Sequence, residues 1–465
     1  MNTANDIHDL LIVGAGINGA GIARDAAGRG LSVALCDKGD IAGATSWASS
    51  KLIHGGLRYL EHYDFALVRE SLQEREVILR IAPHLTNAIR FVMPHTPALR
   101  PAWMIRIGLW LYDHLGGSLS LPKSDCIPLG NGQYGAPLNS IYKKGFIYSD
   151  VQVDDARLTL ANVRDAVNAG ASFMPRTRMI SARRENSLWV CSLAQADGTP
   201  VESRCRALIN AAGPWAAQLH PLLGGQQKIG IQLVRGSHIV VPRLYQGDHA
   251  YTLQNDDGRV VFILPFFGQF SMVGTTEVRM DSPDMSPAAS DEEIDYLCRA
   301  ANRYLHKAIA PSDILWRYAG VRPLLDDGKA DRQTSTSQVS REYQFMLDQP
   351  TTGDAPLLTI IGGKLTTYRR LAEKALARLA STFPHMGPTW TAEKPLPDRE
   401  IDQNASPGID FGGGLCERDV RYFLAHEWAQ DAEDILWRRT KAGLLMTREQ
   451  RDMFATWLEA NRCAM

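Results

Sequence analysis

Residues 45–60 read TSWASSKLIHGGLRYL and combine hydroxyl, cationic and glycine residues that can do chemistry. Lys51 and Arg58 supply positive charge, and His54 supplies a group that titrates near neutral pH. Apolar residues stand between them, which a solvent loop does not need, while a core strand does not tolerate the charges. This mixture of charged and apolar residues is typical of a segment that lines a buried site for an anionic ligand.

A glycine-rich turn precedes this segment. Residues 14–19, GAGING, fit the pattern GxGxxG between an apolar strand and an Ala-rich helix. Glycine there permits a tight turn and close approach to a pyrophosphate, while the helix N-terminus offers amide groups to it. Asp37 ends the next apolar run, where a carboxylate can accept hydrogen bonds from ribose hydroxyls. The turn predicts a dinucleotide site but does not separate FAD from NAD.

A second glycine turn lies far along the chain. Residues 361–364, IGGK, again lead from a strand into a helix. A reduced flavin carries negative charge near N1, and a helix N-terminus beside a lysine is a suitable partner for that charge. Together with residues 14–19 and the charged segment, this turn favours a buried flavin over an exchangeable nicotinamide.

Composition narrows the classes of protein. A chain of 465 residues is expected to form two or three domains, and a net charge of −1 gives no electrostatic drive toward nucleic acid. The seven cysteines show no CxxC pair, so we expect neither a metal site nor disulfides. No signal peptide and no apolar run long enough to span a bilayer are evident. The simplest expectation is a cytoplasmic protein with reduced thiols.

The elements that must position these residues alternate along the chain. Residues 8–38 predict a βαβ unit, and helices are expected over 62–82 and 154–170. Residues 231–278 are β-rich with Gly, Pro and Asp turns, which predicts an antiparallel sheet distinct from the parallel one. A strand then returns at 357–363 before a proline- and glycine-punctuated stretch and a helical end. The nucleotide-binding domain is therefore expected to be interrupted.

Several blocks resemble the aerobic, FAD-dependent glycerol-3-phosphate dehydrogenases. They include the run from Thr45 to Leu85, FIYSDVQVDDARLTLANV, INAAGPWA, RGSHIVVP, YAGVRPLLDD and IGGKLTTYR, in that family's order. The resemblance covers residues 8 to about 380. It implies oxidation of sn-glycerol 3-phosphate to dihydroxyacetone phosphate, with electrons passed through FAD to a membrane quinone. It also implies peripheral attachment to the inner face of the cytoplasmic membrane, and a homodimer is compatible with it.

The same resemblance implies the fold. It is an α/β fold in which a Rossmann-like FAD-binding domain of the glutathione-reductase-2 type is interleaved with an antiparallel-sheet cap domain, followed by a short helical C-terminal domain. The predicted boundaries are 1–70, 150–230 and 345–385 for the FAD-binding domain, 71–149 and 231–344 for the substrate-binding cap domain, and 386–465 for the helical C-terminal region.

The blocks that match the family also indicate which residues bind the substrate. A phosphate monoester needs fixed cations, and the candidates are Arg58, Arg322, Arg341 and Lys364, with Tyr59 and Thr366 beside them. Removal of the hydroxyl proton needs a base near neutral pKa. His238 in GSHIVV is the leading candidate; His54 is the rival, or else a partner of the flavin. With Arg322 and Lys364, these histidines form the predicted catalytic set.

The predicted FAD-binding residues come from the glycine turns, the segment after the second strand, and INAAGPW. They are Gly14, Gly16, Ile17, Asn18, Gly19, Asp37, Lys38, Thr45, Ser46, Ser49, Ser50, Lys51, His54, Gly55, Gly56, Leu57, Ala212, Gly213, Trp215, Gly363 and Lys364. No metal ligands are predicted.

Two departures and three rival functions stand beside this interpretation. Trp47 stands where the family is expected to have a small residue, and the stretch from Pro395 to Arg418 is short. A glycerol-3-phosphate oxidase using oxygen would share these motifs, whereas an amino-acid oxidase would need a carboxylate clamp. The anaerobic quinone-linked relatives carry a cysteine-rich extension that has no counterpart here. Around Trp103 and Trp110, the pattern alone favours a buried cap helix, while the family favours a membrane-contacting one.

Overall fold

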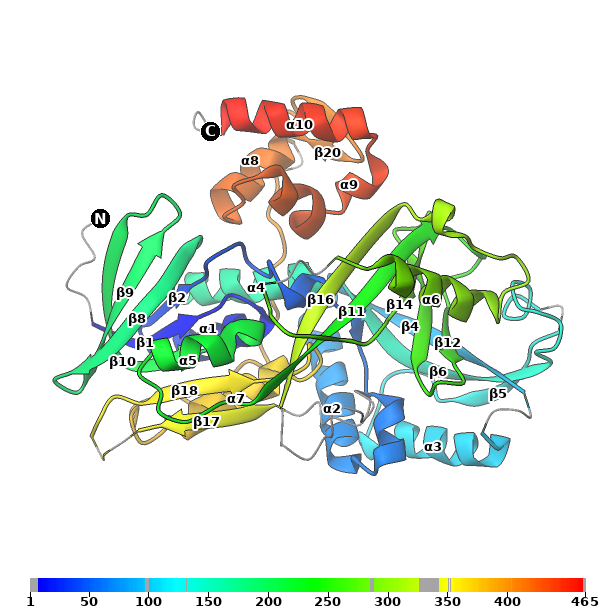
Figure 1. Ribbon diagram of the computed structural model, residues 1–465, viewed down its shortest axis with the longest axis horizontal. Coiled ribbons are helices and arrows are strands. Elements are labelled where there is room, and N and C mark those ends of the chain that lie inside the picture. The colour runs from blue at the N-terminus through cyan, green and yellow to red at the C-terminus, as the bar shows by residue number, and fades with distance from the viewer. Residues whose placement is uncertain are drawn as a thin grey trace.

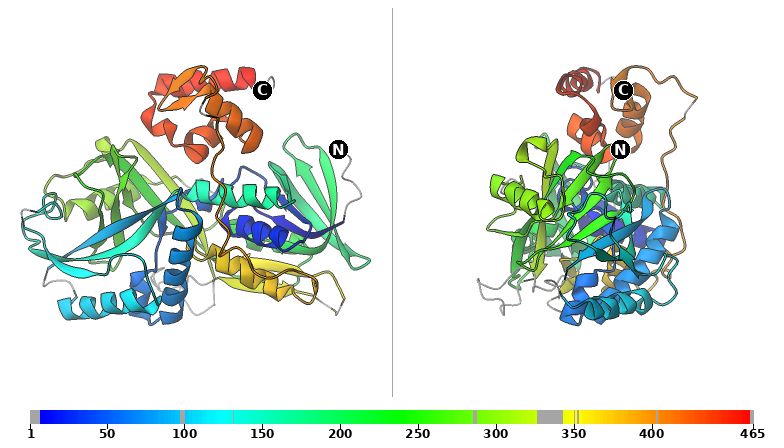
Figure 2. Two further views of the ribbon diagram at one scale, coloured as in Figure 1. Left: turned by 180° about the vertical axis from the view of Figure 1, so that it is seen from behind. Right: turned by 90° about the vertical axis from the view of Figure 1, so that its right-hand side faces the viewer.

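Two sheets lie side by side, and a C-terminal unit, residues 410–462, covers the junction between them (Figure 1). A single extended stretch of chain connects this unit to the rest (Figure 2). The computed structural model describes residues 7–96, 100–130, 132–284, 288–325, 343–349, 351, 353–402 and 404–462.

The first sheet has a parallel core. In spatial order its strands are β17 (Gln344–Asp348), β18 (Leu357–Ile361), β10 (Pro200–Asn210), β1 (Ile7–Val13), β2 (Val33–Cys36) and β7 (Ser172–Met174). Strand β17 runs antiparallel at one edge, and the hairpin β8 (Thr177–Glu185) and β9 (Leu188–Gln195) pairs with β10. Because these strands come from three separated parts of the chain, the predicted interruption of the nucleotide-binding fold is confirmed.

Helices cover both faces of this sheet. Helix α1 (Ile17–Gly28) lies against α4 (Asp155–Asn168) and α7 (Tyr368–Arg378) on one face, and α5 (Ala216–Leu222) lies on the other (Figures 1 and 2). Buried alanines and aliphatic residues of α1, β1, β2 and α7 share one core. Asp154 caps α4 by accepting from the Arg157 amide, as its position before the helix predicts.

The second sheet is mostly antiparallel and curls around its own core, as predicted. Its main order is β15 (Val278–Met280), β11 (Ile231–Pro242), β14 (Phe270–Gly274), β13 (Val260–Phe266), β12 (Ala250–Gln254), β4 (Thr86–His95), β6 (Lys144–Val153) and β3 (Leu52–Ile53). Strand β16 (Trp316–Leu325) pairs with β11, and β5 (Asp125–Pro128) pairs with β6. Although β3 lies within the first predicted FAD segment, it pairs in this sheet.

Three helices accompany the second sheet: α2 (Phe65–Ile81), α3 (Ala102–Leu115) and α6 (Asp291–Asn302). The helix expected over 62–82 begins at Phe65, since residues 57–62 form a separate helical turn, η2 (Leu57–His62). Helix α3 is not buried as the pattern alone favoured, because Trp103 is 62% exposed and Trp110 is 59% exposed. Further short turns are η1 (Thr45–Trp47), η3 (Gly213–Trp215) and η4 (Pro311–Asp313).

The C-terminal unit has its own small core around Phe411, Phe423 and Phe454. It consists of β19 (Asp410–Gly412), β20 (Leu415–Cys416), α8 (Glu417–His426), η6 (Asp434–Arg439), α9 (Ala442–Leu445) and α10 (Arg448–Asn461). The chain is therefore mainly helical from Glu417 onward, as predicted. Within the described residues, no helix is both long and apolar enough to cross a bilayer.

Candidate active site

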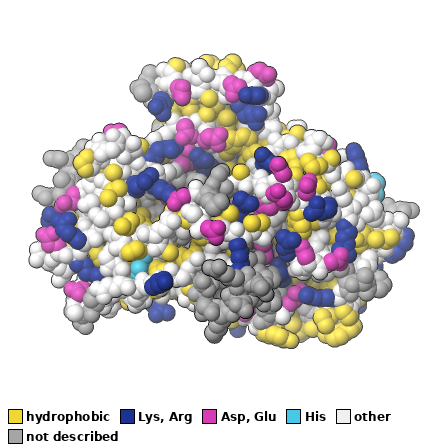
Figure 3. Space-filling view, in the orientation of Figure 1, with side chains coloured by type: hydrophobic (Ala, Val, Ile, Leu, Met, Phe, Trp, Pro, Cys, Tyr) yellow, Lys and Arg dark blue, Asp and Glu magenta, His cyan; other side chains and the backbone are white. Residues whose placement is uncertain are grey.

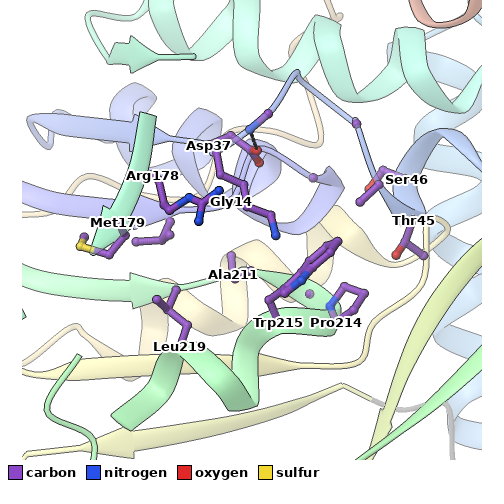
Figure 4. A pocket seen from close by; sticks show the side chains of 18 of the residues that line it. Gly14, Asp37, Thr45, Ser46, Arg178, Met179, Ala211, Pro214, Trp215 and Leu219 are labelled. Carbon is purple, nitrogen blue, oxygen red and sulfur yellow. Dashed lines mark hydrogen bonds between the residues drawn. The ribbon is translucent and has the colours of Figure 1, made fainter. Parts of the chain in front are cut away.

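The first candidate site is a cavity of about 540 Å³ at the carboxyl ends of β1, β2 and β10 (Figure 4). This is where open α/β sheets bind their ligands. Many of the predicted cofactor residues line it, namely Gly14, Gly16, Asp37, Lys38, Thr45, Ser46, Ala212, Gly213 and Trp215. The glycine turn around Gly14 and the INAAGPW stretch therefore line the same cavity.

The glycine turn between β1 and α1 has no room for side chains. Gly14 has a φ of +109°, and a Cβ there would lie 2.5 Å from the carbonyl oxygen of Ala211. A Cβ at Gly19 would overlap the backbone of Gly14. The backbone amide of Ile17 donates to Ser46 Oγ at 2.9 Å, which ties the start of α1 to the segment after β2. The turn thus needs glycine for both conformation and close packing.

Asp37 and Asn18 connect this turn to its neighbours. Asp37 accepts from the amides of Ala15 at 2.7 Å and Gly39 at 2.8 Å, and its burial raises the pKa of the carboxyl above its usual value. Asn18 Nδ2 donates to the carbonyl of Gly362 at 3.0 Å. The two glycine turns, 344 residues apart in sequence, therefore meet at the N-terminus of α1.

The charged residues on this cavity that sequence reasoning missed include Arg176, Arg178, Asp284 and Arg438. Asp284 accepts from the indole Nε1 of Trp215 at 2.6 Å, and Lys38 Nζ lies 3.6 Å from the centroid of the same ring. These residues come from different elements and stand outside the recognised motifs. No spacing along the chain could have indicated them.

Residues 45–51 run from this cavity into the junction of the sheets. Thr45 Oγ1 donates to the carbonyl of Val321 at 2.5 Å, and Ser49 donates through Oγ to Asp155 at 2.7 Å. Lys51 is 2% exposed, and its Nζ donates to Asp155 at 2.8 Å and to the Trp47 carbonyl at 2.7 Å. The predicted cofactor segment is thus held by the second sheet and by α4.

A second, smaller cavity of about 110 Å³ begins where this segment turns. Five consecutive or near-consecutive predicted residues line it: His54, Gly56, Leu57, Arg58 and Tyr59. Gly55 is buried behind them, and its amide donates to the hydroxyl of Tyr112 at 2.8 Å. The opposite wall comes from the second sheet and includes Tyr148, Asp150, Thr252, Gln254, Thr275 and Glu277.

Arg322 and the second glycine turn contact residues that line this cavity. Arg322 on β16 donates from Nη2 to Thr275 Oγ1 at 3.4 Å and lies 3.9 Å from Glu277 Oε1. Lys364 Nζ lies 3.8 Å from the ring centroid of Tyr59, and Thr366 Oγ1 accepts from the His54 amide at 3.2 Å. Five of the six predicted substrate residues therefore lie at this cavity or against its wall: Arg58, Tyr59, Arg322, Lys364 and Thr366. Arg341 lies outside the described residues.

The two candidate bases occupy different positions. His54 lines the smaller cavity. His238 is buried, and its Nε2 lies 2.9 Å from Ser50 Oγ. Burial, reinforced by the charges of Arg322 and Lys51, lowers the pKa of His238 well below its usual value. His238 is therefore neutral at physiological pH and able to accept a proton.

A buried network behind Gly55 was also missed by sequence reasoning. Asp150 accepts from the hydroxyl of Tyr112 at 2.7 Å and from Arg75 Nη1 at 2.9 Å. All three side chains are no more than 2% exposed. A usable signal was present, because Asp150 interrupts the otherwise apolar strand FIYSDVQV. A charge inside a buried strand requires partners.

Trp47, which the sequence left unexplained, packs away from both cavities. Its ring lies 6.0 Å from that of Trp316 and 5.9 Å from that of Tyr318. It also contacts the core of the C-terminal unit. The bulky side chain is thus accommodated at the junction of the three parts of the molecule.

The geometry agrees with what comparison with known proteins finds. Residues 9–369 match the model of the family described as FAD dependent oxidoreductase. The chain belongs to this family. Its cofactor is FAD, and it is an FAD-dependent oxidoreductase of the glycerol-3-phosphate dehydrogenase group.

Relatives of this flavoprotein match nearly the whole chain. A glycerol-3-phosphate dehydrogenase of Pseudomonas aeruginosa is 46% identical, with 98% of this chain and 96% of the relative covered. A D-erythritol 1-phosphate dehydrogenase of Brucella abortus is 44% identical, with 97% of each covered. The FAD-complexed glycerol-3-phosphate dehydrogenase of Bacillus halodurans has the same fold, with a TM-score of 0.71 at 22% identity over 99% of this chain and 95% of that one.

The first cavity of the flavoprotein fits this cofactor. A glycine turn with no space for a Cβ lies over a helix N-terminus, which suits a pyrophosphate, and Asp37 stands at the end of β2, which suits ribose hydroxyls. Residues 45–51 of the flavoprotein lead from this cavity toward the smaller one. Arg58 lines that smaller cavity, and Arg322 and Lys364 contact residues of its wall.

Proposed function

We propose that the chain oxidises the secondary alcohol of sn-glycerol 3-phosphate to dihydroxyacetone phosphate. The observation that carries the proposal is the cluster of Arg58, Arg322 and Lys364 at the smaller cavity, in a chain 46% identical to a protein named glycerol-3-phosphate dehydrogenase. Bound FAD would supply the acceptor for the hydride from C2 of the substrate. The protein's own groups bind the phosphate and take the hydroxyl proton.

The phosphate is assigned to the cations of the second sheet and the second glycine turn. Arg322 offers a planar guanidinium that contacts two phosphate oxygens at once. Arg58 lines the cavity, and Lys364 lies against Tyr59 on its wall. Arg341 remains a proposed fourth cation, on the strength of its sequence block. Tyr59 and Thr366 are proposed to orient the glycerol backbone.

The proton is assigned to His238, with His54 as the alternative. The imidazole would take the hydroxyl proton, and bound FAD would supply the acceptor for the hydride, so that both electrons of the C–H bond leave with the hydride. The bond between His238 Nε2 and Ser50 Oγ, in the predicted flavin segment, supports the candidacy of His238. The position of His54 on the cavity wall supports its candidacy.

The FAD itself is assigned to the first cavity and the segment that leads from it. Gly14, Gly16 and the start of α1 would hold the pyrophosphate, and Asp37 the ribose. Thr45, Ser46, Ser49 and Ser50 would run along the flavin, with Gly363 and Lys364 near its N1 side. Small residues at Ala212 and Gly213 would permit close approach.

A second substrate is favoured by one observation. The Brucella abortus relative, at 44% identity, is named for D-erythritol 1-phosphate, a phosphorylated polyol with one more carbon. The identities do not separate the two substrates. Comparing kcat/KM for glycerol 3-phosphate and erythritol phosphate decides between them, and a higher value for the tetritol phosphate would replace the proposed substrate.

The first experiment is anaerobic mixing of the purified yellow protein with sn-glycerol 3-phosphate. The flavin absorbance near 450 nm should bleach, as expected for a two-electron reduction. Glycerol and sn-glycerol 1-phosphate are the matched controls, since they lack the phosphate and the correct configuration respectively. An unbleached flavin would exclude this substrate.

The electron acceptor is proposed to be a membrane quinone. The competing acceptor is oxygen, as in a glycerol-3-phosphate oxidase. Reoxidation of the reduced protein is the test. Faster reoxidation by a soluble quinone analogue than by air-saturated buffer supports the proposal, and stoichiometric peroxide at the rate of turnover contradicts it.

Peripheral membrane contact is assigned to α3. Trp103, Met104, Ile107 and Trp110 are exposed on this helix, and Figure 3 shows hydrophobic side chains gathered where Figure 1 places it. Arg106 on the same helix supplies charge for anionic headgroups. Sedimentation with vesicles containing anionic lipid should weaken in Trp103→Asp/Trp110→Asp. Met453→Asp, at an exposed apolar site on α10, is the control.

A further inference from the structure

Stacked rings connect the C-terminal unit to the candidate base. Trp437 on η6 stacks on Trp316 of β16, with ring centroids 4.7 Å apart and planes 18° apart. Trp316 contacts Tyr318 at 4.7 Å, because residues two apart on a strand face the same side. Tyr318 in turn lies flat on His238 at 4.9 Å. We call Trp437, Trp316, Tyr318 and His238 the aromatic ladder.

A cluster of buried charges runs beside the ladder. Lys441, four residues after Trp437, is 2% exposed, and its Nζ lies 3.6 Å from Asp154 Oδ1. Lys51 pairs with the adjacent carboxylate of Asp155. Burial lowers the pKa of Lys441, although both carboxylates favour its charged form. The C-terminal unit therefore contributes one of two cations to a carboxylate pair that also holds the flavin segment.

Both features converge on residues 47–51. The Tyr318 hydroxyl donates to the Ser49 carbonyl at 3.1 Å, and Ser50 Oγ bonds His238 Nε2. Trp47 packs against the ladder at Trp316 and Tyr318. The segment is thus held on one side by Asp155 of α4 and on the other by side chains that the C-terminal unit contacts.

The C-terminal unit has other attachments that do not involve the ladder. Arg439 donates to both carboxylate oxygens of Asp40, at 2.5 Å and 2.7 Å. Arg157 on α4 donates to Glu427 at 2.6 Å. These ion pairs also attach the unit to the rest of the molecule. The effect of removing the Trp437 ring from Trp316 can therefore be measured separately from detachment of the C-terminal unit.

We infer that the C-terminal unit, through Trp437 and Lys441, positions residues 47–51 and His238 for FAD binding and hydride transfer. Trp437 and Lys441 are positioning residues, since they act through Trp316, Tyr318 and Asp155. The turnover part of the inference rests on the proposed function, whereas the FAD-binding part does not. Thermodynamic linkage makes this coupling reciprocal. If the C-terminal unit stabilises the conformation of residues 47–51 that binds FAD, then bound FAD must stabilise the contacts of the C-terminal unit with those residues.

Hydrogen exchange on the wild-type protein tests this reciprocity without any substrate. Adding FAD to the apoprotein should slow exchange in residues 440–445, which carry Lys441. Residues 434–439 are not used, because Arg438 lines the FAD cavity and Arg439 pairs with Asp40 there, so bound FAD can slow their exchange directly. Helix α10 belongs to the same unit but lies away from the ladder, so it serves as the control and should change little. Unchanged exchange in 440–445, or equal slowing in α10, overturns the inference. Neither outcome depends on whether glycerol 3-phosphate is the substrate.

Variants then test the ladder itself. Trp437→Leu should weaken FAD binding at least about fivefold, the lower end of typical couplings between sites. It should also lower kcat about tenfold or more, since displacing catalytic groups by about 1 Å can cost about a hundredfold, while KM changes little. Trp437→Phe, which keeps a stacking ring, should restore most of both.

Trp457→Leu is the matched control, because Trp457 packs on Phe411 within the same unit. It should lower the melting temperature and leave FAD affinity and kcat near wild type. Equal effects of Trp437→Leu and Trp457→Leu on FAD affinity overturn the inference. If Trp437→Leu fails to fold, Trp437→Phe and the exchange experiment on the wild-type protein decide it.

Discussion

The imidazole of His238 lies parallel to the phenol ring of Tyr318, with centroids 4.9 Å apart and planes 11° apart. The two residues are direct partners on β11 and β16, and Gly274 on β14 is the partner of His238 on its other side. A ring on one side and a bare Cα on the other fix the plane of the imidazole. This leaves Ser50 Oγ as the bonded partner of Nε2.

Gly274→Ala should therefore damage turnover. A Cβ at this position would overlap Cδ2 of His238, so the imidazole must tilt away from Tyr318. We expect kcat to fall about tenfold or more, because catalytic groups tolerate little displacement, with FAD content unchanged. Gly108→Ala is the control, since a Cβ there meets no atom within 4 Å among the described residues. A kcat within twofold of wild type would show that the orientation of the His238 ring does not matter for the catalytic step.

Local patterns predicted the parts of the site that are local in sequence. The sequence correctly placed the turn at 14–19, Asp37 and the turn at 361–364 directly after strands. Glycine turns and hydrophobic periodicity are local signals that extend over only a few residues. Their meeting through Asn18 and Gly362 was not visible in either pattern.

Other features depend on contacts between distant segments. Trp47 looked misplaced because its partners, Trp316 and Tyr318, are about 270 residues away and belong to the other sheet. The Tyr112 and Asp150 pair joins a helix to a strand, and only the buried charge hinted at it. Periodicity also misplaced α3, because an apolar helical face does not reveal whether protein or something else covers it.

The pH dependence of turnover distinguishes the two histidines. Since the pKa of His238 lies well below the usual histidine value, a base at this position stays deprotonated until the pH falls through that lowered pKa. We expect kcat at saturating substrate to stay flat as the pH falls through about 6.5, the unperturbed histidine value, and to decline only below it. Using kcat limits interference from the substrate phosphate, whose second pKa is about 6.

His238→Asn and His54→Asn complete that test. If His238 is the base, His238→Asn should lower kcat about a hundredfold or more, as removal of a general base commonly does, and His54→Asn should lower it less. An acid limb centred near 6.5 in the wild type would contradict His238 as the base, and the reverse order of the two variants would assign the proton to His54.

Arg322→Ala tests the phosphate site. Loss of the guanidinium removes a charge-assisted pair of hydrogen bonds worth about 1.5 to 3 kcal/mol each, so KM should rise at least about tenfold. FAD content should stay near wild type, because Arg322 lies beside Thr275 and Glu277 at the smaller cavity. Arg317→Ala on the same strand is the control, since Arg317 pairs with Asp291 at the surface. Equal loss of flavin would place Arg322 in the cofactor site instead.

Tyr112→Phe probes the support behind the substrate segment. The Tyr112 hydroxyl donates to Asp150 and accepts from the Gly55 amide, and both partners are buried. Removing it leaves polar groups short of a partner, at a cost of about 1 to 3 kcal/mol in the free energy of unfolding. Since Gly55 stands between His54 and Gly56 on the cavity wall, KM for the substrate should also rise, whereas FAD affinity should not. Chemical denaturation and steady-state kinetics measure the two effects.

Tyr63→Phe, at a site 80% exposed, is the control and should change neither. Lost stability with an unchanged KM would limit the Tyr112 and Asp150 pair to a role in folding.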